Sequence, residues 1–188
     1  NQTLTAIAGG WAGAGTFTPG TSTLKMTGTS KNINYLSGEV IGGLQINTGS
    51  TTLNPIDLTG GTDTFSAAWL QIDSGATLTA TSGTTTITSK TGDYAFNHDG
   101  TFTHNNGTVT ITTSGTSRID PNASGNINNL IYNSSGGTLE IHSLMVLDGD
   151  LTITAGTIDT LSGDPQNLTV AGDVSVTGTL TGNESAIS

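Results

Sequence analysis

The chain has no cysteine, few aromatic side chains and little positive charge. Without cysteine it forms neither disulfides nor thiolate metal sites, and its redox compartment stays undefined. It contains only 4 Lys and Arg against 14 Asp and Glu, which gives a formal net charge of −10. Nucleic acids and anionic membranes both require clustered basic residues, so we expect neither as a partner. No apolar run approaches the roughly 18 residues of a membrane-spanning helix, so we expect no membrane insertion.

The composition favours an all-β protein. Of the 188 residues 27 are Gly, Thr and Ser are abundant, and only 10% are charged. The good helix formers Glu, Lys and Arg are scarce, whereas Thr, Val and Ile suit strands. Low charge combined with recurring short apolar alternations argues against disorder, which normally requires high charge.

Short alternations of apolar and polar residues, separated by Gly, Asn, Asp and Ser, predict many strands. The separating residues adopt positive φ at little cost, as tight turns require. The expected strands are Thr21–Thr27, Gly43–Asn47, Ala76–Ala80, Thr84–Thr88, Thr108–Thr112, Asn129–Asn133, Thr138–Ile141, Leu151–Ile153, Leu168–Val170 and Val174–Val176, followed by Leu180.

Four stretches of the first half return in the same order about 86 residues later. Gly15–Thr18 returns as Gly100–Thr103, Gly28–Lys31 as Gly115–Arg118, Leu44–Asn47 as Leu130–Asn133, and Thr52–Leu53 as Thr138–Leu139. Such self-similarity is typical of solenoids and other repeat proteins. We therefore predict two tandem modules, residues 1–95 and 96–188, which form one continuous rod with its junction in Ser89–Phe96.

Two architectures fit this rhythm, a parallel β-solenoid and a pair of antiparallel β-sandwiches. We favour the solenoid because each module is long enough for several coils of about 20 to 22 residues. Small aliphatic side chains with few aromatics also suit a narrow tube. The residues expected to point inward are Leu24, Met26, Ile33, Leu44, Ile46 and Leu53, with Val109, Ile111, Ile119, Leu130, Tyr132 and Leu139 expected to superpose on them.

Longer segments resemble a known repeat. Trp11–Thr29 (WAGAGTFTPGTSTLKMTGT) and Phe96–Gly115 (FNHDGTFTHNNGTVTITTSG) are similar to a repeat of large virion-associated proteins of marine bacteriophages and of bacterial surface proteins. The pieces GGLQINTGSTTL and NNLIYNSSGGTL resemble its second element. The pieces GDLTITAGTIDT and NLTVAGDVSVTGTLTG resemble its closing elements. The resemblance implies a structural, β-rich segment of a fibre, spike or surface layer, and it brings no catalytic residues.

Several acidic residues are candidate ligands for calcium. Asp148 and Asp150 flank Gly149, and Asp159 and Asp164 follow nearby. Carboxylate oxygens suit calcium, but Gly60–Asp63 matches only the opening of the calcium-binding nonapeptide. Isolated Asp residues beside Gly are more typical of turns. We therefore assign no metal site.

The histidines are His98, His104 and His142. His98 and His104 lie on either side of the Asp99-Gly100 turn and could approach one another, but the usual spacings of metal ligands are missing. We expect surface or turn histidines. No carboxylate pair on one face, nucleophile motif or phosphate-binding loop is present. We therefore expect no enzyme, no catalytic residue and no cofactor.

Thr-x-Thr pairs recur along the chain and would form ladders of hydroxyl groups if adjacent coils placed them in line. They occur at Thr3/Thr5, Thr16/Thr18, Thr77/Thr79, Thr84/Thr86/Thr88, Thr101/Thr103 and Thr110/Thr112. Such ladders can match ordered water and bind ice, although Thr is also the polar residue best suited to a solvated strand face. Asn-x-Ser/Thr sequons, which matter only in a glycosylating pathway, occur at Asn1, Asn106, Asn122, Asn133, Asn167 and Asn183.

We expect a non-enzymatic structural component of a phage virion, either an appendage such as a fibre or spike or a capsid decoration. The alternative is a segment of a cell-surface protein, adhesin or extracellular filament, at the cell surface or secreted. A polysaccharide-active or ice-binding solenoid is a third reading. Expected partners are other copies of the chain, other virion or surface structural proteins, and host-surface glycans.

The two ends of the chain carry no recognisable cap. The chain begins at Asn1 without Met or a signal-like segment, so we expect a processed product or a piece of a longer protein. Neither Asn1–Ala8 nor Gly178–Ser188 resembles a capping helix. Because exposed strand edges pair readily with other chains, we expect at least one end to be covered by a neighbouring subunit or by more polypeptide.

Overall fold

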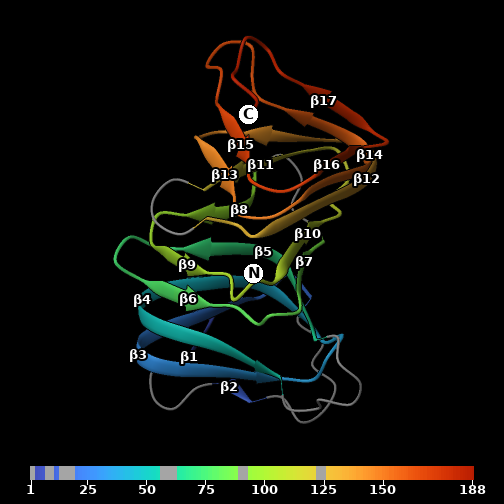
Figure 1. Ribbon diagram of the computed structural model, residues 1–188. Coiled ribbons are helices and arrows are strands. Elements are labelled where there is room, and N and C mark those ends of the chain that lie inside the picture. The colour runs from blue at the N-terminus through green and yellow to red at the C-terminus, as the bar shows by residue number, and fades with distance from the viewer. Residues whose placement is uncertain (1–2, 7–10, 13–19, 56–62, 89–92, 122–125) are drawn as a thin grey trace.

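In the computed structural model the chain is all-β, and no helix occurs in the residues that the structure describes, which are 3–6, 11–12, 20–55, 63–88, 93–121 and 126–188 (Figure 1). This part therefore contains no helix that could cross a membrane. The strands are β1 (Thr3–Ala6), β2 (Trp11–Ala12), β3 (Thr23–Tyr35), β4 (Val40–Pro55), β5 (Thr64–Ile72), β6 (Thr77–Thr79), β7 (Thr84–Ile87), β8 (Tyr94–His98), β9 (Thr101–Thr103), β10 (Thr108–Ile111), β11 (Thr116–Asp120), β12 (Asn129–Ile141), β13 (Met145–Leu147), β14 (Leu151–Asp159), β15 (Leu168–Val170), β16 (Val174–Val176) and β17 (Thr179–Thr181).

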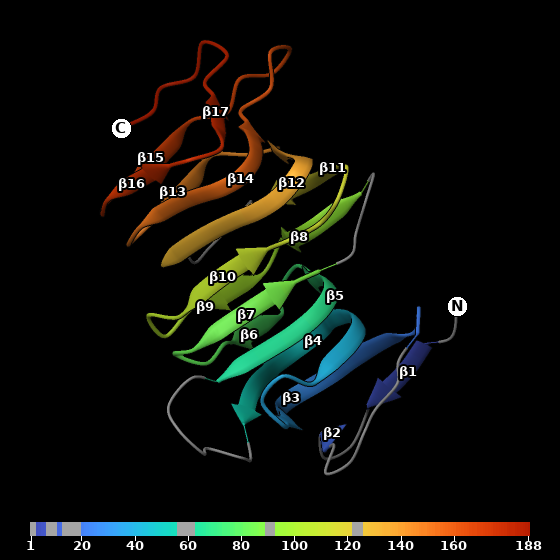
Figure 2. The same ribbon diagram turned by 90° about the vertical axis from the view of Figure 1, so that its right-hand side faces the viewer.

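Each pair of these strands that is joined by hydrogen bonds is parallel. Strands close in sequence cannot pair in parallel through a hairpin, so the chain must wind round and return before it pairs. The protein is a β-solenoid, as predicted, and the antiparallel sandwich alternative is wrong. Figure 2 shows the strands stacked along the long axis of the molecule.

The strands form three ladders, which we call faces A, B and C. Face A comprises residues 40–41, 64–67, 84–87, 108–111, 129–132, 151–153 and 174–176. Face B comprises residues 3–6, 23–26, 43–46, 69–72, 94–98, 116–120, 138–141, 157–159 and 179–181. Face C comprises residues 11–12, 31–35, 50–55, 77–79 and 101–103, then Ile127, 145–147, 168–170 and Ile187.

Side chains alternate between the interior and the solvent along each face, as the sequence pattern indicates. All twelve residues that were expected to point inward are buried. Several long strands run round a corner from face A to face B. In β5, Phe65 and Ala67 point inward on face A, and Leu70 and Ile72 point inward on face B. Ala68 and Trp69, at the corner between the two faces, are both partly exposed. A corner therefore shifts the alternation by one residue.

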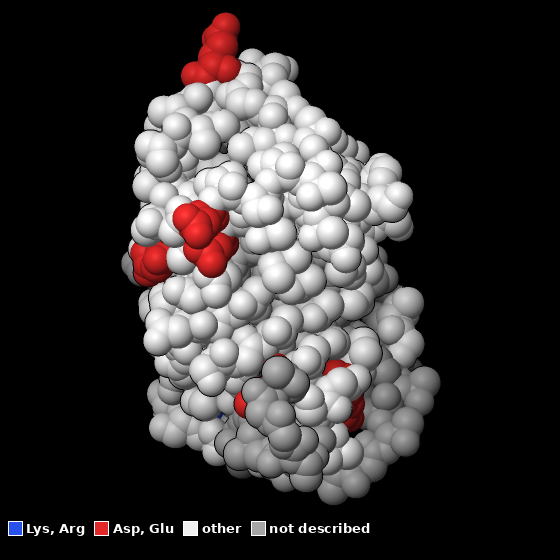
Figure 3. Space-filling view, turned by 45° about the vertical axis from the view of Figure 1, so that its right-hand side comes forward, with Lys and Arg blue, Asp and Glu red and all other residues white. Residues whose placement is uncertain are grey.

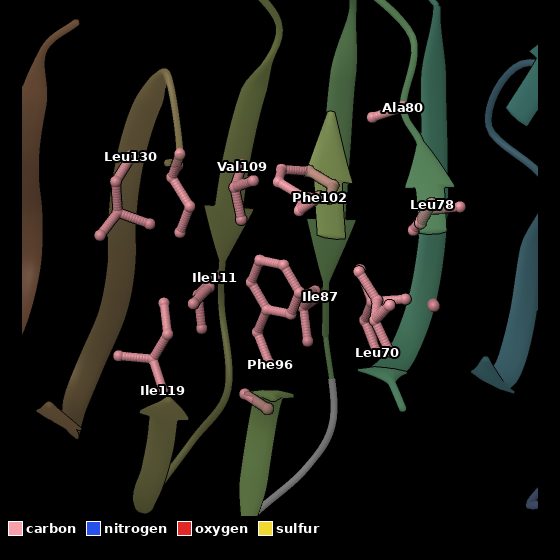
Figure 4. Packing of buried hydrophobic residues seen from close by; sticks show 14 of the residues in the cluster. Leu70, Leu78, Ala80, Ile87, Phe96, Phe102, Val109, Ile111, Ile119 and Leu130 are labelled. Atoms are coloured by element: carbon pink, nitrogen blue, oxygen red, sulfur yellow. The ribbon is translucent and has the colours of Figure 1, made fainter. Parts of the chain in front are cut away.

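The interior holds more aromatic rings than a tube of small aliphatic side chains would. The largest fully buried side chains include Tyr35, Tyr132, Phe65 and Phe96. Figure 4 shows Phe96 and Phe102 side by side in the core, with their ring centroids 5.2 Å apart and an edge-to-face angle of 76°. Most of the described core is nevertheless aliphatic, as expected, with Tyr35, Phe65, Phe96, Phe102 and Tyr132 as its aromatic members.

The two predicted copies do not occupy the same faces. Leu44 lies on face B, where its register partner is Leu70. Its predicted counterpart Leu130 lies on face A, between Val109 and Leu151. Superposing the copies therefore requires a rotation by one face as well as a translation along the axis. The junction itself stays a prediction, since residues 89–92 lie outside the described part. β8 spans residues 95 and 96, and it pairs with β5 on one side and β11 on the other.

Candidate functional site

Among the described residues, the ladder on face C has a gap between β9 and Ile127, and residues 122–125 next to this gap lie outside the described part. β9 pairs with β6 and with no other described strand, while the next residue on this face, Ile127, forms its parallel bridge with Leu147. A polar hollow of about 540 Å³ lies at this interruption. Its lining consists of Thr101, Phe102, Thr103, His104, Asn105, Asn106, Asn126 and Asp148.

A tight turn forms the rim of the hollow. Asn105 and Asn106 have φ values of 48° and 60°, and the N–H of Gly107 donates to the carbonyl of His104 at 2.8 Å. Asn tolerates this left-handed conformation better than most residues. The side-chain amide of Asn105 donates to the carbonyl of Ala80 at 2.7 Å, which ties the turn to the preceding coil.

The hollow also contains a closed hydrogen-bond network. His104 Nε2 lies 3.3 Å from Asp148 Oδ2, and Asn126 Nδ2 donates to Asp148 Oδ1 at 2.7 Å. The backbone N–H of Asn106 donates to His104 Nδ1 at 2.8 Å. This set of contacts requires the neutral imidazole that carries its proton on Nε2. Both ring nitrogens of His104 therefore have hydrogen-bond partners within the chain.

The other acidic candidates also serve as acceptors for neighbouring parts of the chain. Asp150 Oδ1 accepts the N–H of Asp173 at 2.8 Å. Asp159 Oδ1 accepts the N–H of Leu161 at 2.8 Å and a contact from the amide of Asn183. Among the described residues no three His, Asp or Glu side chains gather around a common point. The acids therefore act in turns and between coils, while the Gly60–Gly61–Thr62 segment lies outside the described residues.

The histidines lie in three different environments. His98 is completely buried on face B, in register with Ile72, so the expectation of a surface position was wrong for this residue. Burial lowers the pKa of His98, and a backbone hydrogen bond with Gly100, followed by the charges of Asp120 and Asp99, partly opposes this effect. His104 lies on the partly exposed rim of the hollow, and His142 is partly exposed beside Glu140. His98 therefore belongs to the core, whereas His104 belongs to the rim of the hollow.

A second polar cluster lies on face B, and nothing in the sequence pattern pointed to it. Arg118 is in register with Tyr94 on one side and Glu140 on the other. Arg118 Nε lies 3.3 Å from Glu140 Oε2, and its guanidinium carbon lies 5.9 Å from the centre of the Tyr94 ring. His142 Nε2 contacts the same Glu140 oxygen at 3.2 Å. The length of each coil places these residues on neighbouring strands, so the cluster becomes apparent only from the register of the strands.

Beside this cluster is a shallow pocket of about 80 Å³ with two aromatic walls. It is lined by Trp69, Leu70, Gln71, Asp93, Tyr94 and Asn97. The indole of Trp69 packs over Gly43, where a Cβ atom would overlap the ring. Aromatic rings next to amides and a carboxylate can contact the apolar faces and the hydroxyl groups of a sugar.

Threonine ladders are present but short. Thr77 and Thr79 are in register with Thr101 and Thr103 on face C. Thr84 and Thr86 are likewise in register with Thr108 and Thr110 on face A. The Thr84 column begins at Thr64, and beyond Thr108 its next residue is Asn129, so the face does not become a continuous Thr array. Such short ladders fit a solvated strand face.

On the face seen in Figure 3, acidic side chains form separate small groups among largely uncharged residues. No family model, no curated protein and no solved structure matches this chain.

Proposed function

We propose that the chain is a non-enzymatic structural segment of a phage virion, acting as a length of fibre or spike or as a capsid decoration. The observation that supports this role best is the ladder of face B, which runs from β1 to β17 through parallel pairings. A stack of this kind resists bending and stretching because each coil is hydrogen-bonded to its neighbours. The hollow on face C adds to the argument, because its His–Asp pair is occupied in holding a turn.

The location on a virion is supported by the Gly/Thr/Asn-rich segments that resemble those of marine phage virion proteins. The test is mass spectrometry of gradient-purified particles, together with immunogold labelling by an antibody against this chain. We expect the chain to sediment with the capsid proteins at a constant ratio, and the gold to mark an appendage or the shell. Recovery from the cell envelope, with none in particles, would favour the alternative of a cell-surface filament or adhesin.

Contact with a host-surface glycan is a second candidate role, and the pocket between Trp69 and Tyr94 favours it. An aromatic ring that stacks on a sugar adds a large apolar contact area, and its side chain loses little conformational entropy on binding. We expect purified host-envelope polysaccharide to bind the chain and to quench Trp69 fluorescence in a Trp11→Phe background. The variant Tyr94→Ala should lose this binding, whereas Asn133→Ala, a change at an exposed residue of β12, should keep it. Equal binding by both variants would exclude the pocket.

A further inference from the structure

The pocket between Trp69 and Tyr94 includes part of a column of amide side chains on face B. Gln45, Gln71 and Asn97 are in register on β4, β5 and β8, and all three are partly exposed. Gln71 and Asn97 line the pocket, whereas Gln45 lies outside it. The register of the solenoid thus places two aromatic walls next to polar groups that are held in line.

Asp73 fixes the orientation of the Gln71 amide. Gln71 Nε2 donates to Asp73 Oδ1 at 2.7 Å, and the side-chain amides of Gln45 and Asn47 donate to Asp73 Oδ2 at 2.8 and 2.6 Å. The amide nitrogen of Gln71 therefore serves the protein itself. Its carbonyl oxygen is the group that can accept a hydrogen bond from a ligand in the pocket.

A ligand that matches the pocket must donate hydrogen bonds as well as accept them. Asp93 is an exposed acceptor in the lining, and its Oδ1 receives the N–H of Tyr94 at 2.8 Å. The amide nitrogen of Asn97 and the hydroxyl group of Tyr94 are donors. A sugar hydroxyl group both donates and accepts, whereas the carboxylate or sulfate group of an acidic sugar only accepts. Hydroxyl groups therefore fit the Gln71 carbonyl and the Asp93 carboxylate, and acidic groups do not.

The charges around the pocket also disfavour an acidic sugar. The described cations on face B are Lys25, two strands before β5, and Arg118, on the strand after β8. Arg118 Nε lies 3.3 Å from Glu140 Oε2, so the charge of Arg118 is balanced within the protein. Asp93 in the pocket and Asp120 on β11 are both acidic. An anionic ligand would therefore meet a surrounding of its own sign.

We propose that this pocket binds uncharged saccharides and rejects acidic ones. The sugar ring stacks on Trp69 and Tyr94, and its hydroxyl groups donate to the Gln71 carbonyl and the Asp93 carboxylate. At about 80 Å³ the pocket is far smaller than the about 300 Å³ at which pockets begin to enclose a whole ligand, so it contacts one unit of a longer polysaccharide. The inference rests on the glycan contact proposed above and adds the class of glycan that is bound.

The first test is binding of the purified chain to an array of neutral, uronate-containing and sulfated polysaccharides. We expect neutral members to bind and to quench Trp69 fluorescence in a Trp11→Phe background, while the acidic members stay unbound at the same concentration. Preferential binding of acidic members would overturn this inference and leave the glycan role standing. Binding of neither class would refute the glycan role together with this inference.

The second test separates the acceptor role of Gln71 from its contact with Asp73. Gln71→Met should weaken binding of the neutral polysaccharide by about tenfold, because a hydrogen bond to the sugar is lost. Gln45→Met is the matched control, since Gln45 donates to the same carboxylate but lies outside the pocket. Circular dichroism of both variants confirms that they fold. Equal affinities of the two variants would show that Gln71 does not contact the sugar.

The third test asks whether the pocket's own charge excludes acidic sugars. Asp93→Asn retains a side-chain acceptor and removes a charge, so neutral polysaccharide should still bind while acidic polysaccharide gains affinity. Asp164→Asn removes the same charge at an exposed position between β14 and β15, and it should change neither affinity. Equal gains of acidic polysaccharide in both variants would assign the rejection to the net charge of −10 and overturn the selectivity of the pocket.

Discussion

The imidazole of His98 lies against the ring of Phe96 in the core, with the ring centroids 5.3 Å apart and the planes inclined by 39°. Neither nitrogen of His98 has a hydrogen-bond partner of good geometry, although the backbone of Gly100 lies close enough to favour the protonated ring. Phe102 flanks the same imidazole at 6.2 Å. A titratable ring is thus held as an apolar side chain, and Asp99 and Asp120 are the charged groups that act on it.

We predict that stability decreases as the pH falls below the ordinary histidine pKa of 6.5. Burial lowers the pKa of His98 in the folded protein, so in this range the unfolded chain binds more protons than the folded one. Stability from this residue is therefore complete above 6.5 and is lost toward acid, by at most about 1.4 kcal/mol per pH unit. Urea unfolding between about pH 7.5 and pH 5.5 measures it. His98→Leu should flatten this dependence, whereas His142→Gln should retain it, and an unchanged slope in His98→Leu would refute the assignment.

We predict that Leu130→Asp prevents folding. Leu130 is completely buried between Val109 and Leu151, so its replacement would place an unpaired carboxylate in the core. Leu130→Ala should fold with a loss of about 2–5 kcal/mol. The control is Ile131→Asp, because Ile131 is the next residue of β12 and is partly exposed. Circular dichroism and urea unfolding distinguish the three variants, and a folded Leu130→Asp protein would show that this position is not part of the core.

We predict that Gly43→Ala displaces the indole of Trp69. A Cβ atom at Gly43 would overlap that ring, and the strain should cost about 1–3 kcal/mol. Fluorescence of Trp69 in a Trp11→Phe background should shift toward the red as the ring becomes more exposed. Gly163→Ala is the matched change, since nothing lies within 4 Å of the added carbon there. Identical spectra for the two variants would mean that the ring does not pack on Gly43.

We predict that His104→Ala, Asp148→Ala and Asp150→Ala each leave folding and assembly intact. Exposed or half-exposed polar contacts contribute about 0–1 kcal/mol, and the Asp148 side chain is 46% exposed. Asp73→Ala should cost more, because both Asp73 oxygens accept amide donors, from Gln45, Asn47 and Gln71 at 2.6–2.8 Å. Thermal unfolding ranks the four variants. Loss of assembly with an intact fold in any of the first three would reveal a functional role for the hollow.

Strands with uniform alternation were the easiest to predict. The alternation in β7, β10, β15 and β16 agrees with the predicted strands to within about two residues. β5 was missed because it turns a corner between Ala67 and Leu70, where the alternation shifts by one residue. β8 was missed because two consecutive residues, Ala95 and Phe96, are buried and break the alternation, and β13 because all three of its residues, MVL, are apolar. Local patterns thus predict straight strands and miss corners.

The hollow and the polar cluster on face B could not be predicted from local alternation. His104 and Asp148 were both noted as candidates, but their contact joins positions on different coils, and only the winding of the chain brings them together. Tyr94, Arg118 and Glu140 were not recognised as a group at all. Their meeting depends on the length of each coil to within one residue, because a slip of one residue would turn each side chain to the other face.

From the sequence alone it followed that this chain is all-β and that the twelve expected inward residues form its core, and parallel coils were favoured over antiparallel sandwiches. These properties follow from local alternation, turn residues and repeat length, each of which is readable along one stretch of chain. The tertiary structure alone decided that Leu44 and Leu130 lie on different faces and that His98 is buried. These depend on the lengths of the individual coils, since the sum of those lengths sets which residue stacks on which.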